Sequence, residues 1–278
     1  MSAQLFVVAT PIGHLDDMTY RAIEILKSVK LIAAEDTRTS AQLLKHFNIT
    51  TPLTACHDHN ESHKIEQLIE KLKQGENIAL ISDAGTPLIS DPGFKLVRAA
   101  QENNIRVTPV PGACAAIAAL SAVGLPSDRF SFQGFLSSKS SQRKATLEQL
   151  KNETQTLIFY EAPHRILDCV KDMAEIFGAD RAVGFAREIT KTFETIKKMT
   201  LTELVDFIEH DHNQQKGEIV LVVAGANGTK EPTQSELDTL LIRLLQDLSV
   251  KAAAQLASDL TGVKKKIAYQ RALELKPE

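Results

Sequence analysis

The feature that most constrains the fold of this chain is an alternation of short apolar, β-branched runs with segments of helical periodicity. Runs of this length, bounded by polar or turn residues, are typical of buried strands. A strand–helix–strand series predicts a largely parallel sheet that is covered by helices. In the first half of the chain the expected strands are Leu5–Thr10, Lys30–Ala34, Ile78–Asp83 and Arg106–Val110.

Helical segments lie between these strands, and a second series of both kinds follows. The first-half helices are expected at Thr19–Val29, Ser40–Phe47, Glu61–Lys73 and Phe94–Asn103, and a helix of small residues at Ala113–Val123 joins the two series. The second-series strands are expected at Phe130–Phe135, Thr156–Tyr160, Ala182–Ala186 and Glu218–Ala224, with helices at Gln142–Lys151, His164–Phe177 and Leu201–His210.

Beyond Gly225 the composition changes to a polar linker, and three helical segments follow it. Thr261 and Gly262 separate the last two segments, and a glycine just past a helix allows the chain to turn, so a small helix-turn-helix-like extension is expected. The chain is therefore expected to be an α/β protein with two α/β domains and this helical extension. The expected domains are residues 1–118, 119–230 and 231–278, and the three helices are Ser235–Asp247, Val250–Leu260 and Val263–Leu275.

Composition and charge restrict the class of protein. With 43% hydrophobic and 24% charged residues the chain is typical of a globular protein, and no apolar stretch reaches the ~20 residues that span a membrane. A net charge of −3 does not suit a protein that binds nucleic acid over its whole surface, so any RNA contact is expected to be local. The N-terminus lacks the pattern of a secretory signal, and we expect a cytoplasmic protein without a membrane partner.

The cysteines and histidines do not predict a metal site. Cys56, Cys114 and Cys169 are widely separated, and none belongs to a C-x-x-C pair, so buried or incidental thiols are expected. The segment His57–Glu61, with His63, offers imidazole and carboxylate ligands, but no companion ligand set accompanies it. We therefore expect no metal.

Four loops follow expected strands at the edge where open α/β sheets bind ligands. The most informative is Ser82–Gly93, in which two glycines and two prolines fix a tight path and leave main-chain groups accessible. These groups, with Asp83 and Asp91, suit a polar cofactor, although a plain connecting loop explains the same composition. The spacing fits neither a P-loop nor a dinucleotide fingerprint.

The other three loops leave more open. Ala9–Asp17 and Ala34–Arg38 are consistent with strand-to-helix turns capped by an aspartate, and equally with binding loops. Val110–Ala116 enters a helix of small residues, which allows either a ligand at the helix N-terminus or close packing.

Five strings of the chain form a set, and they are Val8–Gly13, Ala33–Arg38, Ser82–Gly93, Val110–Gly112 and Phe159–Arg165. They run in order along nearly the whole chain, and five motifs together are far more specific than one glycine-rich loop. Taken together, they resemble the tetrapyrrole methylase superfamily, and more narrowly its branch of 16S rRNA (cytidine 2'-O)-methyltransferases. Two places depart from the family pattern, because His14 stands where the family has Asn and Ala113-Cys114 where Pro-Ser is commoner.

The resemblance implies two α/β domains of the tetrapyrrole methylase type, usually in a homodimer, with S-adenosyl-L-methionine in the cleft between them. The segment Gly85–Pro87 and the turn Val110–Gly112 would wrap this cofactor, and the second domain would contribute an aromatic pair. The cofactor-binding residues expected on this basis are Pro11, Gly13, Asp83, Gly85, Thr86, Pro87, Ser90, Asp91, Pro111, Gly112, Ala113, Ala115, Phe159 and Tyr160.

Methyl transfer to a ribose 2'-hydroxyl needs alignment and the removal of a proton from a weakly acidic group. The candidate bases are Asp36, Glu161, Glu188 and Lys191, of which Asp36, Glu161 and Lys191 are preferred. Each acid is as readily explained as a helix cap or a surface ion pair, and the lysine would need a lowered pKa. Guanidinium groups match phosphates bidentately. The RNA-binding residues expected are Arg38, Arg165 and Arg187, and two basic clusters that ordinary solvated surfaces also explain, Lys139 with Arg143 and Lys144, and Lys264, Lys265 and Lys266.

These expectations define one hypothesis for the function and two alternatives. The hypothesis is S-adenosylmethionine-dependent 2'-O-methylation of a cytidine in the decoding region of 16S rRNA, with the 30S subunit and a second copy of the chain as partners. A methyltransferase for a tetrapyrrole or another small molecule is the first alternative, and the lysines of the C-terminal helices weigh against it. A non-catalytic RNA-binding assembly factor is the second, and it would lack affinity for the cofactor.

Overall fold

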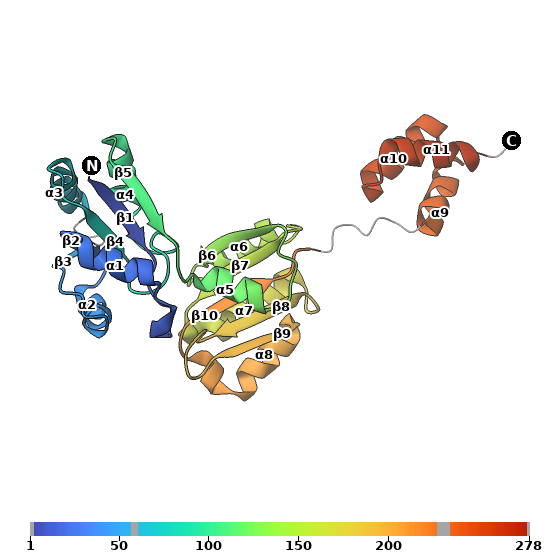
Figure 1. Ribbon diagram of the computed structural model, residues 1–278. Coiled ribbons are helices and arrows are strands. Elements are labelled where there is room, and N and C mark those ends of the chain that lie inside the picture. The colour runs from blue at the N-terminus through green and yellow to red at the C-terminus, as the bar shows by residue number, and fades with distance from the viewer. Residues whose placement is uncertain (1–2, 57–60, 227–233, 277–278) are drawn as a thin grey trace. The chain divides into compact units, whose positions relative to one another are not determined.

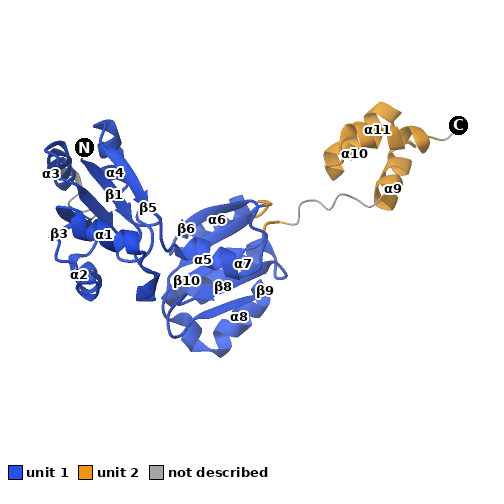
Figure 2. Ribbon diagram, in the orientation of Figure 1, with its two compact units in different colours: residues 1–150, 155–224 blue, residues 151–154, 225–278 orange. Residues whose placement is uncertain are grey.

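The computed structural model describes residues 3–56, 61–226 and 234–276 of the chain. The structure divides into two compact units, one of residues 1–150 and 155–224 and one of residues 151–154 and 225–278 (Figure 2). The first unit contains two sheets, and the second contains the C-terminal helices. The domain boundaries expected after residues 118 and 230 stay predictions.

The first sheet is parallel, as the alternation predicts. Its strand order is β3-β2-β4-β1-β5, and its central strand β4 is buried along its whole length because helices cover both faces (Figure 1). The helices α1 and α2 pack on one face, and α3 and α4 pack on the other. In chain order the elements are β1 (Gln4–Val8), the 3₁₀ helix η1 (Leu15–Asp17), α1 (Tyr20–Ser28), β2 (Leu31–Ala34), α2 (Thr37–His46), β3 (Leu53–Ala55), α3 (Glu61–Lys73), β4 (Ile78–Ile81), α4 (Phe94–Glu102) and β5 (Arg106–Val110).

The second sheet is mixed, and the expectation of a largely parallel sheet is wrong for this half. Its order is β6-β7-β10-β8-β9, and the central strand β10 runs antiparallel to both β7 and β8. β9 pairs with β8 as an antiparallel hairpin, whereas β6 runs parallel to β7. The elements are α5 (Ala115–Ala122), β6 (Phe130–Phe135), α6 (Ser140–Leu150), β7 (Thr156–Glu161), η2 (Pro163–Arg165), α7 (Ile166–Phe177), β8 (Ala182–Arg187), β9 (Thr195–Thr200), α8 (Leu201–His210), η3 (His212–Gln215) and β10 (Ile219–Val223).

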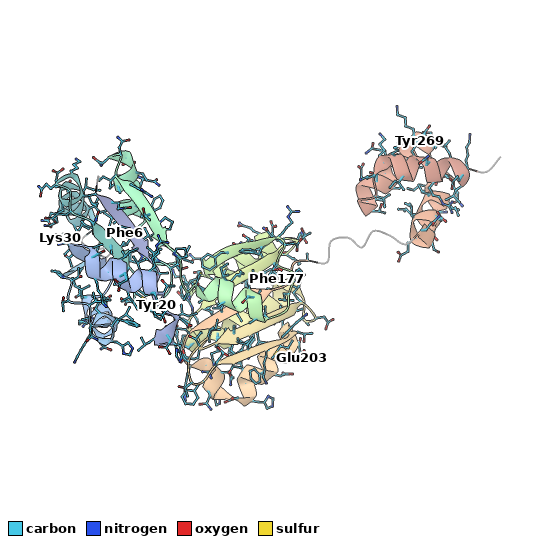
Figure 3. All side chains as sticks on the ribbon, viewed as in Figure 1. Phe6, Tyr20, Lys30, Phe177, Glu203 and Tyr269 are labelled. Atoms are coloured by element: carbon cyan, nitrogen blue, oxygen red, sulfur yellow. The ribbon has the colours of Figure 1, made fainter. Side chains whose placement is uncertain are left out.

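Helices cover both faces of this second sheet. α6, α7 and α8 pack on one face, where Phe177 at the end of α7 (Figure 3) joins a core that includes Phe159 and Phe185. α5 packs on the other face, against side chains such as Ile158 and Val222. Neighbouring residues of β7 therefore serve different layers, because side chains alternate along a strand.

The second unit contains α9 (Gln234–Leu244), α10 (Val250–Thr261) and α11 (Lys265–Glu274). Gly262 ends α10 in the left-handed region at φ 74°, which confirms the turn that the sequence predicts. Arg271 of α11 forms two hydrogen bonds of 2.6 Å with the carboxylate of Asp238 on α9. The helical extension is confirmed as a small unit with its own apolar core.

The ends of many elements agree with the sequence pattern. α1 begins after Thr19, whose side chain accepts from the Ala22 main-chain N–H, and α8 begins with a capping box between Thr200 and Glu203. β3 and β9 are strands that the pattern does not predict. Within the described ranges, none of the helices is long and apolar enough to cross a membrane.

Candidate functional site

A cavity of about 410 Å³ lies in the first unit at one edge of both sheets. Its volume is in the range of small-molecule binding sites. The four strand-end loops all contribute to it, through Ile12, Glu35, the segments Asp83–Thr86 and Ile89–Asp91, and Cys114 with Ala115. The second sheet contributes the end of β7 and the beginning of β10. The prediction that these loops meet at one ligand site is therefore supported by the geometry.

Hydrogen bonds tie three of the loops together. Thr10 and Gly85 exchange two main-chain hydrogen bonds, of 2.9 and 3.1 Å, and so form an isolated bridge between the first and third loops. The Thr86 hydroxyl donates to the Ala113 carbonyl at 2.9 Å and links the third loop to the fourth. Gly85 has φ 82°, a conformation that a side chain would strain.

The third loop contains unusual backbone at two further residues. Leu88 and Ser90 lie in the left-handed region with φ of 74° and 66°, although neither is a glycine. Such conformations are costly and cluster at functional sites, where the surrounding structure holds them in place. The loop is thus built for a definite shape around the cavity, which Ser90 also lines.

The cavity is acidic. Partial removal from water raises the pKa of the Asp83 and Asp91 carboxyls above the ordinary value. Within the part of the chain that the structure describes, no lysine, arginine or histidine lines the cavity. The site therefore favours a ligand with positive charge and disfavours phosphate. Five lining residues are acidic: Glu35, Asp83, Asp91, Glu161 and Glu218.

Tyr160 forms an aromatic wall of the cavity. Its hydroxyl accepts a hydrogen bond of 3.1 Å from the Ala116 main-chain N–H, and its ring meets Phe132 and Phe135 edge to face at centroid distances of 4.9 and 5.7 Å. Burial raises the pKa of the Tyr160 hydroxyl, which therefore stays protonated. Phe159 does not share this role. It is fully buried in the core on the other face of β7, so its predicted cofactor contact is wrong.

Glu161 ends β7 and lines the cavity, although its side chain is only 1% exposed. Its Oε1 accepts from Arg165 Nε at 2.5 Å and from the Ala162 main-chain N–H at 2.7 Å. Its Oε2 is buried, and the carboxylate also contacts the thiol of buried Cys169 on α7.

Asp36 and Arg38 form an ion pair just after the lining residue Glu35. Arg38 Nη2 lies 2.7 Å from Asp36 Oδ2, and the hydrogen bonds from Arg38 lower the pKa of the Asp36 carboxyl to about 2. Asp36 caps α2 and does not line the cavity. Its main-chain N–H donates to Asp83 Oδ1 at 3.1 Å, which joins the second loop to the third. So weak a proton acceptor does not suit the base role predicted for Asp36.

Lys191 is also held by ion pairs, which do not suit a base. Its Nζ lies 2.9 Å from Glu188 Oε1 and 3.1 Å from Glu218 Oε2. Although desolvation acts to lower it, these hydrogen bonds raise the pKa of Lys191 above its ordinary value. These contacts oppose the predicted base role, because a lysine must be neutral to accept a proton. A Cβ on Gly13 would lie 2.6 Å from Lys191 Cγ, so the lysine stem packs against the first loop.

Half of the predicted cofactor-binding residues line the cavity, and these are Asp83, Gly85, Thr86, Ser90, Asp91, Ala115 and Tyr160. Pro11, Gly13, Pro87, Pro111, Gly112, Ala113 and Phe159 do not. Some residues of this second group instead allow the loops to pack closely, since a Cβ on Gly112 would lie only 2.9 Å from Ala9 Cβ. Sequence reasoning missed lining residues such as Glu35, Phe135 and Glu218. Glu35 stands inside a motif and was open to prediction, whereas nothing in the sequence marks the segment before β10.

Two of the arginines predicted to bind RNA are buried. Arg143 is 3% exposed and lies 2.6 Å from Asp172, and Arg187 is 6% exposed and donates to the Phe193 carbonyl at 2.9 Å. Their predicted phosphate contacts are wrong, because both guanidinium groups are used inside the protein. Arg165 and Lys144 pair with Glu161 and Glu175, and the exposed Arg38 pairs with Asp36. Lys139, Lys264, Lys265 and Lys266 are exposed.

The described part of the chain contains no group of three histidine, cysteine or acidic side chains that could hold a metal ion. The His57–Glu61 segment bears on this question, but residues 57–60 and the side chains of residues 61–63 lie outside the described residues. The expectation of no metal therefore stays a prediction.

Comparison with known proteins agrees with the fold and the motifs. Residues 4–205 match the family of Tetrapyrrole (Corrin/Porphyrin) Methylases, and residues 231–276 match the RsmI C-terminal HTH domain. The chain is similar to a ribosomal RNA small subunit methyltransferase I of Pseudomonas aeruginosa, at 56% identity over 97% of this chain and 96% of the relative. A relative of the same name in Synechocystis sp. is 46% identical over 99% of both chains.

Solved structures support the same architecture at low sequence identity. The uroporphyrin-III-C-methyltransferase of Thermus thermophilus superposes with a TM-score of 0.57 at 17% identity, over 81% of this chain and 96% of that one. A cobalt precorrin-4 methyltransferase gives a TM-score of 0.60 at 13% identity, over 80% and 94%. At this identity the likeness shows the fold alone. With the family match over most of its length and relatives this similar, the chain belongs to the tetrapyrrole methylase family, in the group of the ribosomal RNA small subunit methyltransferases I.

Proposed function

We propose that this protein transfers a methyl group from S-adenosylmethionine to the 2'-hydroxyl of a cytidine in the decoding region of 16S rRNA. The relatives at 46–56% identity, which carry the name ribosomal RNA small subunit methyltransferase I, support the class of substrate. The observation that supports S-adenosylmethionine as the cofactor is the acidic cavity at the strand-end loops, which is lined by five carboxylates.

The cavity fits this cofactor by charge and by size. S-adenosylmethionine is positively charged at its sulfonium and at its ammonium group, and carboxylates such as Asp83 and Asp91 are suited to both. The volume of about 410 Å³ is that of a site for a molecule of this size. The aromatic wall at Tyr160 and the apolar side chains of Ile12 and Ile89 suit a nucleoside.

When bound, S-adenosylmethionine supplies a methyl carbon that its sulfonium already activates. The residues of the chain then have to exclude water, hold the acceptor in line and accept its proton. The third loop, with its rigid backbone between Gly85 and Ser90, is suited to hold the cofactor side of this arrangement. The carboxylates of the cavity also disfavour the phosphates of the RNA, which leaves the ribose hydroxyl as the group that enters.

We retain Glu161 as the proton acceptor. It lines the cavity, which Asp36, Glu188 and Lys191 do not. Arg165 and the Ala162 N–H hold Oε1, which fixes the orientation of the carboxylate. A positioned base contributes about 10²- to 10⁴-fold to such a reaction, so alignment alone would leave measurable activity.

The RNA contact is proposed to involve exposed cations away from the cavity. Lys139 and the three lysines at the start of α11 are exposed, and the phosphate backbone provides most of the affinity in such complexes. The 30S subunit as the substrate, a homodimer as the active form and a cytoplasmic location are parts of the same proposal. Dissociation of the dimer on dilution, followed by scattering, tests the oligomeric state.

The central experiment is methyl transfer from labelled S-adenosylmethionine to unmethylated 30S subunits. We expect label in 16S rRNA, in nucleosides methylated at the 2'-oxygen of cytidine. No incorporation by folded protein that binds the cofactor would overturn the proposal. Label that survives ribonuclease treatment would favour the small-molecule alternative, and an absence of cofactor binding in calorimetry would favour the assembly-factor alternative.

A further inference from the structure

A second hollow lies beside the acidic cavity and differs from it in chemistry. It is open, has a volume of about 600 Å³, and is bounded by Gly13–Asp16, His46 and Thr190–Thr192. The two spaces share a wall. Lys191 lines the hollow and Glu218 lines the cavity, and their ion pair of 3.1 Å stands between them. None of the roles proposed above accounts for this hollow.

The loop between β8 and β9 forms one side of the hollow and is held rigidly. Arg187, buried at the end of β8, donates to the Phe193 carbonyl at 2.9 Å, and the Thr190 main-chain N–H donates to Glu194 Oε2 at 2.7 Å. Glu188 and Thr190 have φ of 50° and 66°, and a β-branched residue is rarely found in this region. The Thr190 hydroxyl also accepts from the His14 main-chain N–H at 3.0 Å, which ties the two sides together.

This rigid loop presents an aromatic side chain to water. Phe193 directly follows the lining residue Thr192, and 71% of it is exposed. Its backbone is fixed by Arg187, so the exposure is a property of a well-held loop rather than of a mobile tip. An exposed ring on a loop whose backbone is held by hydrogen bonds, close to a polar hollow, is suited to stack on a base of a single-stranded nucleic acid.

The hollow offers donors where the cavity offers acceptors. His14 and His46 carry ring N–H groups, and Lys191 uses two of its three ammonium hydrogens for Glu188 and Glu218. Asp16 is the acidic side chain in this set. These donors suit the oxygens of a sugar–phosphate backbone, whose phosphates the acidic cavity disfavours.

We infer that this hollow binds a nucleotide of single-stranded RNA next to the ribose that is methylated, with Phe193 stacking on its base. The inference rests on the proposed function, because it assigns a subsite for the RNA substrate of the same reaction. The histidines and Lys191 contact the sugar–phosphate backbone there. Buried Arg187 acts as a positioning residue, since it holds the loop and cannot itself reach the RNA.

The test compares substitutions of Phe193 in the full-length protein with wild type on 30S subunits. The loss of stacking on one base weakens RNA binding roughly tenfold or more. We expect Phe193→Ala to lower kcat/KM for the RNA about tenfold through KM, and to leave the affinity for S-adenosylmethionine unchanged. Phe193→Trp restores the activity because it keeps a stacking face, whereas Phe193→Leu, which keeps only apolar bulk, does not. Phe130→Ala, at a 41% exposed aromatic at the start of β6, is the matched control and keeps wild-type KM.

The outcomes separate this inference from the proposed function. If wild type labels no RNA, the proposed function fails and Phe193 is not the cause. If wild type is active and Phe193→Ala is equally active, the stacking subsite is refuted. Equal activity of Phe193→Leu and wild type, or a change of oligomeric state in Phe193→Ala by light scattering, assigns the ring to an apolar protein contact and also overturns the inference.

Discussion

The cavity of the first unit and the beginning of α11 in the second unit are opposite in charge, and both are arranged against local stability. In the cavity, Asp83 and Asp91 lie where desolvation raises their pKa. At α11, Lys264, Lys265 and Lys266 stand at the positive end of the helix dipole, where cations are unfavourable by about 0.3–1 kcal/mol each. A ligand of opposite charge would relieve the unfavourable electrostatic energy of each region. The difference indicates that a cationic cofactor and an anionic RNA are bound by separate parts of the chain.

The largest expected effect tests whether methyl transfer takes place in the cavity. Glu161→Gln keeps an amide oxygen that accepts from Arg165, so the fold is expected to survive, but it removes the proton acceptor. We expect methyl transfer to fall about 10²- to 10⁴-fold, with the affinity for S-adenosylmethionine and for RNA nearly unchanged. Single-turnover kinetics with saturating cofactor measure this step. A variant that is folded and fully active would show that Glu161 only positions α7.

The next effect tests the charge of the cavity. Asp83→Asn and Asp91→Asn are each expected to weaken the binding of S-adenosylmethionine about 10- to 100-fold, since a charged hydrogen bond contributes about 1.5–3 kcal/mol. S-adenosylhomocysteine, whose sulfur is neutral, is expected to lose less. Calorimetry measures both, with the exposed Asp128→Asn as the control. An equal loss for both ligands would contradict the electrostatic account.

The same carboxyls predict the sign of the pH dependence. A raised pKa means that the native protein binds these protons more tightly than the unfolded chain does, so the unliganded protein gains stability as the pH falls from neutrality through the raised pKa, above the ordinary 3.8. Cofactor affinity moves the other way, because protonation removes the negative charge. The unfolding temperatures measured with and without cofactor should converge as the pH falls from neutral to mildly acidic. Parallel curves would rule out the two aspartates as the charged contacts.

A smaller effect is expected at α11. Replacing Lys264, Lys265 and Lys266 by glutamine should weaken RNA binding and reduce its salt dependence, by up to about 0.7 in the log–log slope for each lost phosphate contact. The helix itself should become slightly more stable, because its dipole no longer faces three cations. Binding assays at several salt concentrations measure the first effect, and amide exchange in α11 of the full chain measures the second. Unchanged slopes would assign the lysines to a solvated surface.

The smallest effect concerns Lys191. Lys191→Arg keeps a cation for Glu188 and Glu218, and an arginine cannot act as a base at ordinary pH. We expect methyl transfer within about twofold of wild type and an unaltered pH–rate profile. A loss of about 10²-fold with normal cofactor binding would restore the base role that the contacts oppose.

Much of the fold follows from local pattern. The apolar face of Glu61–Lys73 and the capping residues Thr19 and Thr200 specify helices without knowledge of their partners. Strand direction does not follow from such patterns, because a fully buried strand such as β10 has the same apolar composition whichever way it runs. β9 is missed for a related reason: its Lys197 and Lys198 interrupt the alternation and face water at the edge of the sheet.

The motifs specify the candidate site better than they specify its chemistry. The sequence shows the glycines and prolines that allow the tight path of Ser82–Gly93 around the cavity, whereas the left-handed Leu88 and Ser90 appear only in the structure. Burial and charge pairing also cannot be read from the sequence. Whether Arg143 meets RNA or Asp172, and whether Lys191 is neutral or charged, depends on residues distant in the chain, since desolvation and charge partners are set by packing.

The sequence alone therefore determined the α/β class, the helical extension and the loops that gather at one edge, because these depend on local periodicity, turn chemistry and the recurrence of motifs. Only the tertiary structure decided that the second sheet is mixed, that Tyr160 rather than Phe159 lines the cavity, and that Phe193 is exposed beside a second hollow. The physical reason is the same in each case: a side chain's burial and its charge partners are properties of neighbours that the chain brings together only on folding.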